Sequence, residues 1–449
     1  MVHHFHLPIK IKVSLKNYST NSNIIIDSYL SLSLMDLKGT SGVVPLRKML
    51  LVVTLCAIFS VSLSKVNDTT NDQILNSKPA APSKSPDYTF HFAIQGNVYP
   101  LGCYTVKVAI GNPPKLYDLD IDSGSDLTWV QSKPCKSCIP SSQYYAYNPN
   151  NNIPCNDPLC VALNKNCRPS TGPCKYTLEY ADDESSSGVL VRDLISFRLD
   201  NGSILHPPLG FGSGADQKPS NHHHFSHTKT AGVFGLGHGK TSILSQLSSL
   251  GYIRNVFGHC LSSKGGGRLF LGNDKTSKSL VWTSILKSPS SIIDHYRAGP
   301  VDLLFNGKQQ AVKGVEVIFD SGSTYTYLNQ KVYKALFDLM NNDLGKKLQR
   351  ANLDHTLPIC WKGQNLFGYF KNIVLNFSKT NSQFILTPQS YLIVSELHNT
   401  CLGILDGSEE GLGDINIIGD ISLQDKLVVY DNEKMKIGWS PDNCASPPS

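Results

Sequence analysis

Two short segments of the sequence place a carboxylate in the same setting, because Asp-Ser-Gly-Ser occurs at residues 122–125 and again at 320–323. When two carboxylates lie close together in a partly buried site, they cannot both ionise cheaply, so they share one proton and titrate as a unit. The ionised group can take a proton from a water held between them, while the protonated group polarises a peptide carbonyl and later donates to the leaving nitrogen. We therefore predict that Asp122 and Asp320 form a catalytic pair for peptide hydrolysis, with no metal and no cofactor.

The other residues of the two segments suit this task. In each segment the glycine allows a sharp turn that brings backbone N–H groups onto the carboxylate. The last serine can hydrogen-bond the outer carboxylate oxygen, and the first serine could lock one loop to the other. One such tetrapeptide alone is usually an ordinary turn, but two copies in corresponding contexts are hard to ascribe to chance. The predicted supporting residues are Ser123, Gly124, Ser125, Ser321, Gly322 and Ser323.

The surrounding sequence is typical of an all-β protein. From about Tyr99 onward, short apolar runs are separated by turns rich in Gly, Pro, Asn and Asp, and the best helical periodicity lies at 242–250 and 330–340. Each Asp-Ser-Gly-Ser follows an apolar run, and each is followed later by an apolar pair before a glycine, at 233–235 and 417–419. Two similar halves indicate a duplicated lobe. We predict an N-terminal lobe at 96–280 and a C-terminal lobe at 281–449.

The composition excludes some classes of protein. The 449 residues include 17% charged and 40% hydrophobic residues, with a formal net charge of +6. These values are typical of a globular chain with sizeable cores. Because Lys and Arg are spread out and form no basic stripe, no nucleic-acid partner is expected.

The N-terminal region resembles a secretory signal. Arg47 and Lys48 precede an almost wholly apolar run, and we assign residues 49–64 to a signal peptide. A membrane anchor is the alternative, but the run is too short to cross about 30 Å of hydrocarbon comfortably, so no stable anchor is expected. Met49 is well placed as the true start. Residues 1–48 would then be an upstream extension, and residues 65–95 a linker or short propeptide.

The cysteines also indicate export. Of the 12 cysteines, Cys56 lies in the signal, and ten of the others could form five disulfides with one left over. Glycosylation sequons follow at Asn67, Asn201 and Asn376. We expect the secretory pathway, with an extracellular (apoplastic) or vacuolar destination.

Seven motifs carry a resemblance to a known family. From about Tyr99 to Cys444, the sequence resembles the pepsin-like aspartic proteases, and more closely their plant nucellin-like and Asp-protease-1-like branch. The resemblance implies an all-β bilobal fold with an interlobe cleft under a flap hairpin, and polypeptide substrates bound in an extended conformation. We also expect a monomer. The motifs are LDIDSGSDLTWV (119–130), AGVFGLG (231–237), NVFGHCL (255–261), FDSGSTYTYL (319–328), LPICWK (357–362), CLGILDG (401–407) and NIIGD (416–420).

The resemblance also implies roles for single residues. Tyr180 matches the flap tyrosine and Trp129 the tryptophan that supports it, although either aromatic alone would more often be a core residue. Close relatives usually carry Cys at the positions of Ser132 and Ser213, so we infer that a disulfide of those relatives is absent here. Cys103 replaces a usual aromatic or His and is the candidate for the left-over thiol.

The disulfide candidates follow from the same resemblance. Three bridges are expected among six clustered cysteines of the N-terminal lobe, with their connectivity open. Cys360–Cys401 and Cys260–Cys444 are expected to pair. The six clustered residues are Cys135, Cys138, Cys155, Cys160, Cys167 and Cys174.

Other readings of these residues are weaker. A Ca²⁺ loop counted from Asp118 fails, because the sixth and twelfth positions hold Ser123 and Trp129. A Mg²⁺-dependent phosphotransferase would not explain the second Asp-Ser-Gly-Ser. Cys135 and Cys138 could be a redox pair or half a zinc site, but export favours a disulfide. The histidines at 222–224 and 227 could bind a metal, but their polar surroundings favour an exposed loop.

The predicted function is therefore a secreted aspartic endopeptidase that hydrolyses peptide bonds at acid pH. The alternative is a catalytically silent pepsin-like protein that serves in binding or inhibition. Such relatives typically lose a catalytic Asp or distort its loop, whereas both loops are intact here.

Overall fold

The computed structural model describes residues 88–138, 143–164, 166–181, 184–199, 201–218, 230–273, 280–287 and 295–445, all within one compact unit. The predicted extension at 1–48, the signal at 49–64, most of the linker at 65–95, Asn67 and the four histidines at 222–227 lie outside these residues. Within the described part, no helix combines the length and apolar character needed to cross a membrane.

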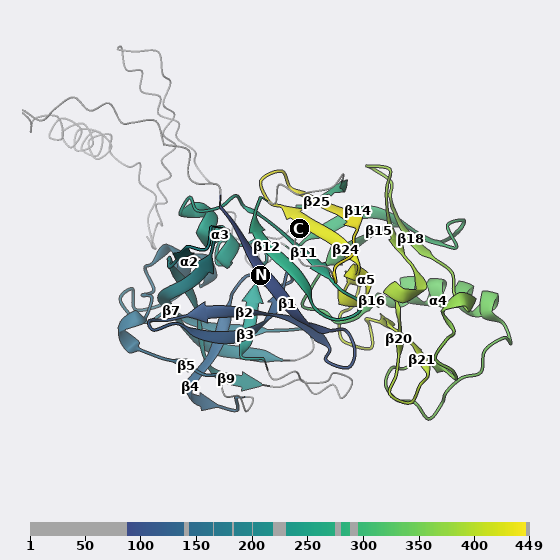
Figure 1. Cartoon of the computed structure of the whole chain (residues 1–449), viewed down its shortest axis with the longest axis horizontal. Coiled ribbons are helices and arrows are strands. Elements are labelled where there is room, and N and C mark those ends of the chain that lie inside the picture. The colour runs from purple at the N-terminus through teal and green to yellow at the C-terminus, as the bar shows by residue number, and fades with distance from the viewer. Residues whose placement is uncertain are drawn as a thin grey trace, which may run out of the picture. The chain divides into compact units, whose positions relative to one another are not determined.

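The described chain is built mainly from strands, which confirms the all-β prediction (Figure 1). Its largest sheet has 15 strands, in the order β13-β25-β24-β11-β12-β1-β2-β3-β10-β4-β9-β7-β6, with β5 beside β4 and β8 beside β7. The strands are β1 (Thr89–Asn97), β2 (Cys103–Ile110), β3 (Lys115–Asp122), β4 (Trp129–Lys136), β5 (Tyr145–Ala146), β6 (Lys175–Glu179), β7 (Ser185–Arg198), β8 (Ile204–Leu205), β9 (Pro208–Lys218), β10 (Gly232–Gly235), β11 (Val256–Leu261), β12 (Gly267–Gly272), β13 (Val281–Ser284), β24 (Lys426–Asp431) and β25 (Lys436–Pro441).

The second half of the chain contributes two further sheets. One has seven strands in the order β19-β18-β14-β15-β23-β16-β22, and the other has the order β17-β21-β20. Their strands are β14 (Arg297–Phe305), β15 (Gln309–Phe319), β16 (Thr326–Leu328), β17 (Cys360–Trp361), β18 (Ile373–Phe377), β19 (Ser382–Leu386), β20 (Leu392–Val394), β21 (Thr400–Leu402), β22 (Ile404–Asp406) and β23 (Ile417–Ile418).

The helices are few and short. The periodicity at 242–250 and 330–340 corresponds to α3 (Ile243–Ser249) and α4 (Gln330–Leu344). The side chain of Asn329 caps α4 by accepting from Val332 N at 3.1 Å. The remaining helical segments are α2 (Pro158–Leu163), α5 (Asp420–Leu423), η1 (Pro149–Asn151), η2 (Phe367–Tyr369) and η3 (Pro388–Ser390).

The large sheet joins the two halves of the chain. Strand β24 of the second half pairs with β11 of the first. Strand β25 pairs with β24 and with β13, both within the second half. Figure 1 shows the yellow strands β24 and β25 beside the teal strands β11 and β12. At the other end of the described chain, β1 begins at Thr89 and pairs with β12. The last residues of the range assigned to a linker or propeptide, 65–95, therefore belong to this sheet.

Strand periodicity positions the two Asp-Ser-Gly-Ser loops. In β3, Tyr117, Leu119 and Ile121 are buried in the core, so the alternate residues point to the opposite face and the strand ends at Asp122. In β15, Phe319 is buried directly before Asp320. Each strand has a short parallel neighbour: β10 beside β3, and β23 beside β15. The apolar pairs before glycine thus flank the two loops in the same way.

Five disulfides link the predicted candidates. Cys260–Cys444 and Cys360–Cys401 are both formed. The six clustered cysteines pair as Cys135–Cys138, Cys155–Cys167 and Cys160–Cys174. Among the described cysteines, Cys103 is the one outside a disulfide, and it is buried.

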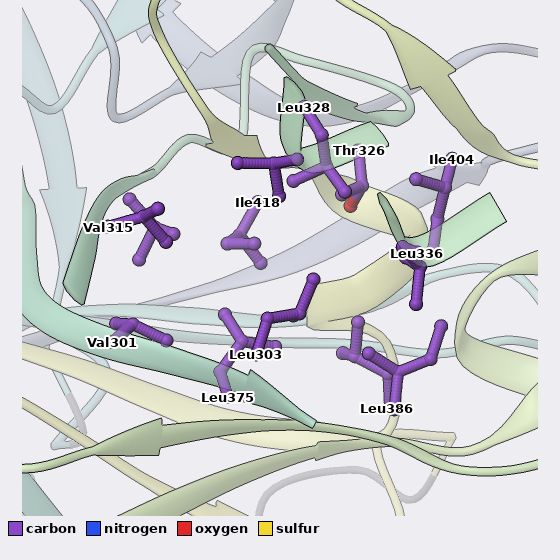
Figure 2. A pocket seen from close by; sticks show the side chains of 13 residues that line it. Val301, Leu303, Val315, Thr326, Leu328, Leu336, Leu375, Leu386, Ile404 and Ile418 are labelled. Atoms are coloured by element: carbon purple, nitrogen blue, oxygen red, sulfur yellow. The ribbon is translucent and has the colours of Figure 1, made fainter. Parts of the chain in front are cut away.

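A small cavity lies inside the core of the second half. Its volume is about 10 Å³, which is room for about one water. Figure 2 shows its lining, which is apolar apart from Thr326. It is too small to bind a ligand larger than a water.

Candidate active site

The first serine of each loop forms hydrogen bonds with the opposite loop. Ser321 N donates to Ser123 Oγ at 2.9 Å, and Ser123 N donates to Ser321 Oγ at 3.1 Å. Each hydroxyl also donates into the opposite loop: Ser123 Oγ to Phe319 O at 3.2 Å, and Ser321 Oγ to Ile121 O at 2.9 Å. Both serines are 1% exposed, so these bonds lie in a setting where an unpaired polar group would be costly. The interlock expected from the sequence is therefore present.

The glycines bring the carboxylates close together. A Cβ added to Gly124 would lie 2.6 Å from Asp320 Oδ1, and one added to Gly322 would lie 2.4 Å from Asp122 Oδ1. Each carboxylate therefore packs directly against the glycine of the opposite loop. Any larger residue at either glycine would push the two loops apart.

Each carboxylate also accepts hydrogen bonds from residues of its own loop. Asp122 Oδ1 accepts from Gly124 N at 2.7 Å and from Ser125 N at 3.2 Å, and its Oδ2 accepts from Ser125 Oγ. Asp320 accepts from Gly322 N at 2.9 Å and from Ser323 Oγ at 2.8 Å. The glycines and last serines thus make the contacts that the sequence predicted.

The electrostatics of the pair favour one retained proton. Asp122 is 6% exposed, and burial together with the charge of Asp320 raises its pKa to about 7, against the lowering effect of the hydrogen bonds from Ser125 and Gly124. A carboxyl with this pKa stays protonated in the acid range, where it can donate a hydrogen bond.

Two further carboxyl groups near the pair were missed by sequence reasoning. Asp120 lies on the same face of β3 as Asp122, and burial followed by the charge of Asp122 holds its pKa well above the usual range. Asp420, which is 1% exposed, has its pKa raised by burial and then by the charge of Asp120. The Oδ1 atom of each is buried without a hydrogen-bond partner among the described residues. Alternation with Asp122 is the sequence signal for Asp120, whereas Asp420 stands at the end of the motif NIIGD and no local pattern points it toward the pair.

The two predicted aromatic residues meet beside the pair. Trp129 Nε1 donates to Tyr180 OH at 2.7 Å. Tyr180 follows β6 in the β6–β7 hairpin, where its N–H donates to Glu184 O at 2.8 Å. Burial, followed by the charge of Asp122, raises the pKa of Tyr180, and the hydrogen bond from Trp129 opposes this rise. Tyr180 therefore lies close enough to Asp122 for the two groups to interact.

The cysteine clusters offer no obvious metal site. Within the described residues, two groups of potential ligands lie close together. In both, the sulfur atoms belong to disulfides, so they cannot act as thiolate ligands. The groups are Cys155, Cys160 and Cys167, and Asp354, Cys360 and Cys401.

The two serines at the inferred missing disulfide face each other. Ser213 Oγ on β9 donates to Ser132 Oγ on β4 at 2.8 Å, and Ser132 Oγ donates to Gly214 O at 3.1 Å. Both are buried. A hydrogen bond therefore occupies the place where a covalent bridge would fit.

Comparisons with known proteins agree with this geometry. Models described as Xylanase inhibitor N-terminal and Xylanase inhibitor C-terminal match residues 104–273 and 301–441. An aspartic proteinase of rice (Oryza sativa subsp. japonica) is 36% identical over 379 residues, covering 78% of this chain and 90% of the rice protein. The chain belongs to the pepsin-like aspartic protease family. Aspartic proteinase 36 of Arabidopsis thaliana is 30% identical over 375 residues, covering 77% of this chain and 75% of that protein.

Solved structures confirm the bilobal pepsin-like fold. The basic 7S globulin from soybean superposes with a TM-score of 0.63 at 18% identity, covering 79% of this chain and 95% of the globulin. Conglutin gamma from lupine seeds gives a TM-score of 0.61, also at 18% identity, covering 79% and 95%. These likenesses concern the fold alone, so the chemistry must be argued from the loops.

Proposed function

We propose that this member of the pepsin-like family is a secreted aspartic endopeptidase that hydrolyses peptide bonds at acid pH. The observation that carries the proposal is the reciprocal packing of each carboxylate against the glycine of the opposite loop. Because this packing brings the two acid groups together from different loops, a single water can lie within reach of both. Polypeptide substrates would bind in an extended conformation to a monomer.

The proposed mechanism assigns a role to each carboxyl. Asp122 is the more buried of the two and keeps the shared proton in the acid range. Asp320 is then the base that takes a proton from the water, while Asp122 donates to the oxygen of the scissile carbonyl. Collapse of the tetrahedral species passes a proton to the leaving nitrogen and restores the pair. No covalent intermediate is needed.

The experiment that tests this proposal measures proteolysis directly. Purified mature protein should cleave denatured globin at acid pH, and pepstatin, whose tetrahedral hydroxyl resembles the transition state, should block the cleavage. Cleavage that peaks at neutral pH and ignores pepstatin would contradict the proposed mechanism.

A second candidate function is a catalytically silent binding or inhibitor protein. The matching family models are described for xylanase inhibitors, which is the observation in its favour. The intact pair of loops favours the peptidase. Adding the purified protein to fungal and bacterial xylanases distinguishes the two, because inhibition without cleavage of any peptide supports only the inhibitor.

We further propose that the protein passes through the secretory pathway to the apoplast or the vacuole. The predicted signal at 49–64 and the five disulfides support this route. Asn201 is an exposed glycosylation candidate in the β7–β8 turn, where its Oδ1 accepts from Ser203 N at 3.0 Å. Asn376, by contrast, lies within β18 between two paired strands. A glycosidase-sensitive mass shift lost in Asn201→Gln, with a mature N-terminus after residue 64, would support secretion.

A further inference from the structure

One disulfide of the first half differs from the others in its surroundings. Cys135–Cys138 joins cysteines three positions apart where β4 ends, and both cysteines are partly exposed. Each of the other four bridges includes at least one buried cysteine. An attacking thiol reaches a buried sulfur only when the protein opens, so Cys135–Cys138 is the bridge most accessible to thiol–disulfide exchange.

This bridge should also contribute least to the stability of the fold. A disulfide stabilises a protein mainly by restricting the unfolded chain, and the effect grows with the length of the closed loop. Cys135–Cys138 has a sequence separation of 3, against 12, 14, 41 and 184 for the other four bridges. Its reduction should therefore leave the protein folded, with the other bridges in place.

The bridge closes a turn that holds one residue in an unfavourable conformation. Ser137 lies between the two cysteines with a φ of 59°, in the left-handed region that residues other than glycine rarely adopt. The bridge keeps the Cα atoms of Cys135 and Cys138 5.7 Å apart, within the limit for a four-residue turn. Once the sulfur atoms separate, Ser137 can return to an ordinary backbone conformation and the turn can open.

Open space and a positive charge lie beside the bridge. Cys135, Cys138 and Lys133 are among the residues that line an open surface hollow of about 760 Å³. The Lys133 ammonium lies 4.5 Å from the centre of the Tyr144 ring, which lines the same hollow. A cation near a disulfide stabilises both the attacking and the leaving thiolate, so these surroundings favour exchange.

The bridged turn lies in the same row of the sheet as the hairpin that carries Tyr180. Lys136, inside the turn, pairs with Asp216 of β9, and Asp216 pairs with Ser187 of β7. Ser187 in turn pairs with Thr177 of β6. Opening of the turn at Lys136 would therefore release the end of β9 that supports the β6–β7 hairpin.

We propose that Cys135–Cys138 is a site of reversible thiol–disulfide exchange with a dithiol protein of the thioredoxin class, and that its reduction loosens the β6–β7 hairpin. A thiolate of the dithiol protein attacks one sulfur of the bridge, which forms a mixed disulfide and releases the other sulfur as a thiolate. The second thiol of the dithiol protein then attacks the mixed disulfide. Two electrons and two protons pass to Cys135 and Cys138, and the dithiol protein is left as a disulfide.

The spacing of the two cysteines favours a dithiol over a monothiol. After the first attack, the released cysteine lies three positions from the mixed disulfide and can close the bridge again, which expels a monothiol. A dithiol competes with this closure because its own second thiol is held equally near. Glutathione should therefore reduce the bridge at least about tenfold more slowly than thioredoxin at the same thiol concentration.

The test maps the reduced cysteines of the purified mature protein. The protein is incubated with thioredoxin, which its reductase and NADPH keep reduced, and accessible thiols are blocked with N-ethylmaleimide in native buffer. After denaturation, the remaining thiols receive an isotopically heavy form of the reagent, and mass spectrometry assigns both labels. We expect the light label on Cys135 and Cys138, the heavy label on the buried Cys103, and no label on the cysteines of the other four bridges.

A charge variant and its matched control test the role of the hollow. Lys133→Gln should slow the reduction by thioredoxin about three- to tenfold, because it removes the cation beside the sulfur atoms. Lys115→Gln removes an exposed positive charge at the start of β3 and should leave the rate unchanged. Equal rates in the two variants would show that the cation of the hollow does not promote exchange.

Amide hydrogen exchange tests the link to the hairpin. After reduction, amides of β6 and of the paired part of β7 should exchange at least about threefold faster. Combining Cys135→Ser with Cys138→Ser should reproduce this change without any reductant and should keep the protein folded, as its unfolding midpoint would show. Amides of α4 in the second half should exchange as before.

Several results would overturn the inference. Reduction of the buried bridges together with Cys135–Cys138, or no light label on this pair, would exclude selective exchange. Glutathione as fast as thioredoxin would exclude the preference for a dithiol, and unchanged exchange of β6 and β7 would exclude the link to the hairpin. No step measures peptide cleavage, so failure of this inference and failure of the proposed peptidase function are distinguishable.

Discussion

The two Asp-Ser-Gly-Ser loops have the same sequence but different surroundings. Asp122 is 6% exposed and accepts from two backbone N–H groups and a hydroxyl, whereas Asp320 is half-buried and accepts from one N–H and one hydroxyl. The repeat gives both loops the same local contacts, while burial and the charge of Asp320 raise the pKa of Asp122.

The largest effect is expected from removing either acid group. Asp122→Asn and Asp320→Asn should each lower kcat/KM by at least about 10³-fold, because the pair acts as a unit. Measurement with a quenched peptide at acid pH tests this. Asp118→Asn is a matched control on the same strand, since Asp118 pairs with Lys107 at the surface and should be dispensable. Substantial cleavage by either pair variant would disprove the shared role of the two loops.

The pH dependence of stability should reveal which loop holds the proton. Because the pKa of Asp122 is raised to about 7 in the folded protein, its contribution is fully present below the unfolded value of 3.8 and is lost as pH rises through about 7. The free energy of unfolding should fall by at most about 4 kcal/mol between pH 4 and pH 8. Urea unfolding at several pH values measures this, and Asp122→Asn should flatten the slope. An unchanged slope in that variant would place the proton elsewhere.

A disulfide engineered into the first half should stabilise the protein without changing catalysis. Ser132→Cys combined with Ser213→Cys replaces a hydrogen bond of 2.8 Å by a covalent link between β4 and β9. An added bridge of this kind typically contributes about 2–4 kcal/mol. Thermal unfolding with and without reductant gives the gain, and kcat gives the control. A bridge that changes kcat would show that the β4–β9 region is energetically coupled to the Asp122 loop.

The smallest difference should separate the last serines of the two loops. Ser125→Ala removes a hydroxyl that bonds the more buried carboxyl, Asp122, whereas Ser323→Ala removes one that bonds the half-buried Asp320. We expect kcat to fall about tenfold for the first and about threefold for the second. Equal losses would mean that the difference in burial between the two carboxyls does not matter for turnover.

Much of this site could be predicted from sequence because its determinants are local. Alternation of apolar residues identifies β3 and β15, and the glycine and serines that follow each Asp act within their own loops. The reciprocal hydrogen bonds of Ser123 and Ser321 were also expected, because a duplicated lobe must bring equivalent loops together at the interface of the halves.

The remaining parts depend on contacts between distant strands. Asp420 becomes part of the carboxyl cluster only once β23 lies beside β15. The sequence does not fix the pairing of the six clustered cysteines, since six cysteines allow 15 connectivities and local spacing does not choose among them.

A crystal structure of the purified protein with pepstatin bound at acid pH would show whether the two carboxylates act together. The inhibitor hydroxyl should lie within hydrogen-bonding distance of the carboxylates of both Asp122 and Asp320, in place of the attacking water. A hydroxyl held by one carboxylate alone, with the other turned away, would contradict the shared-proton mechanism.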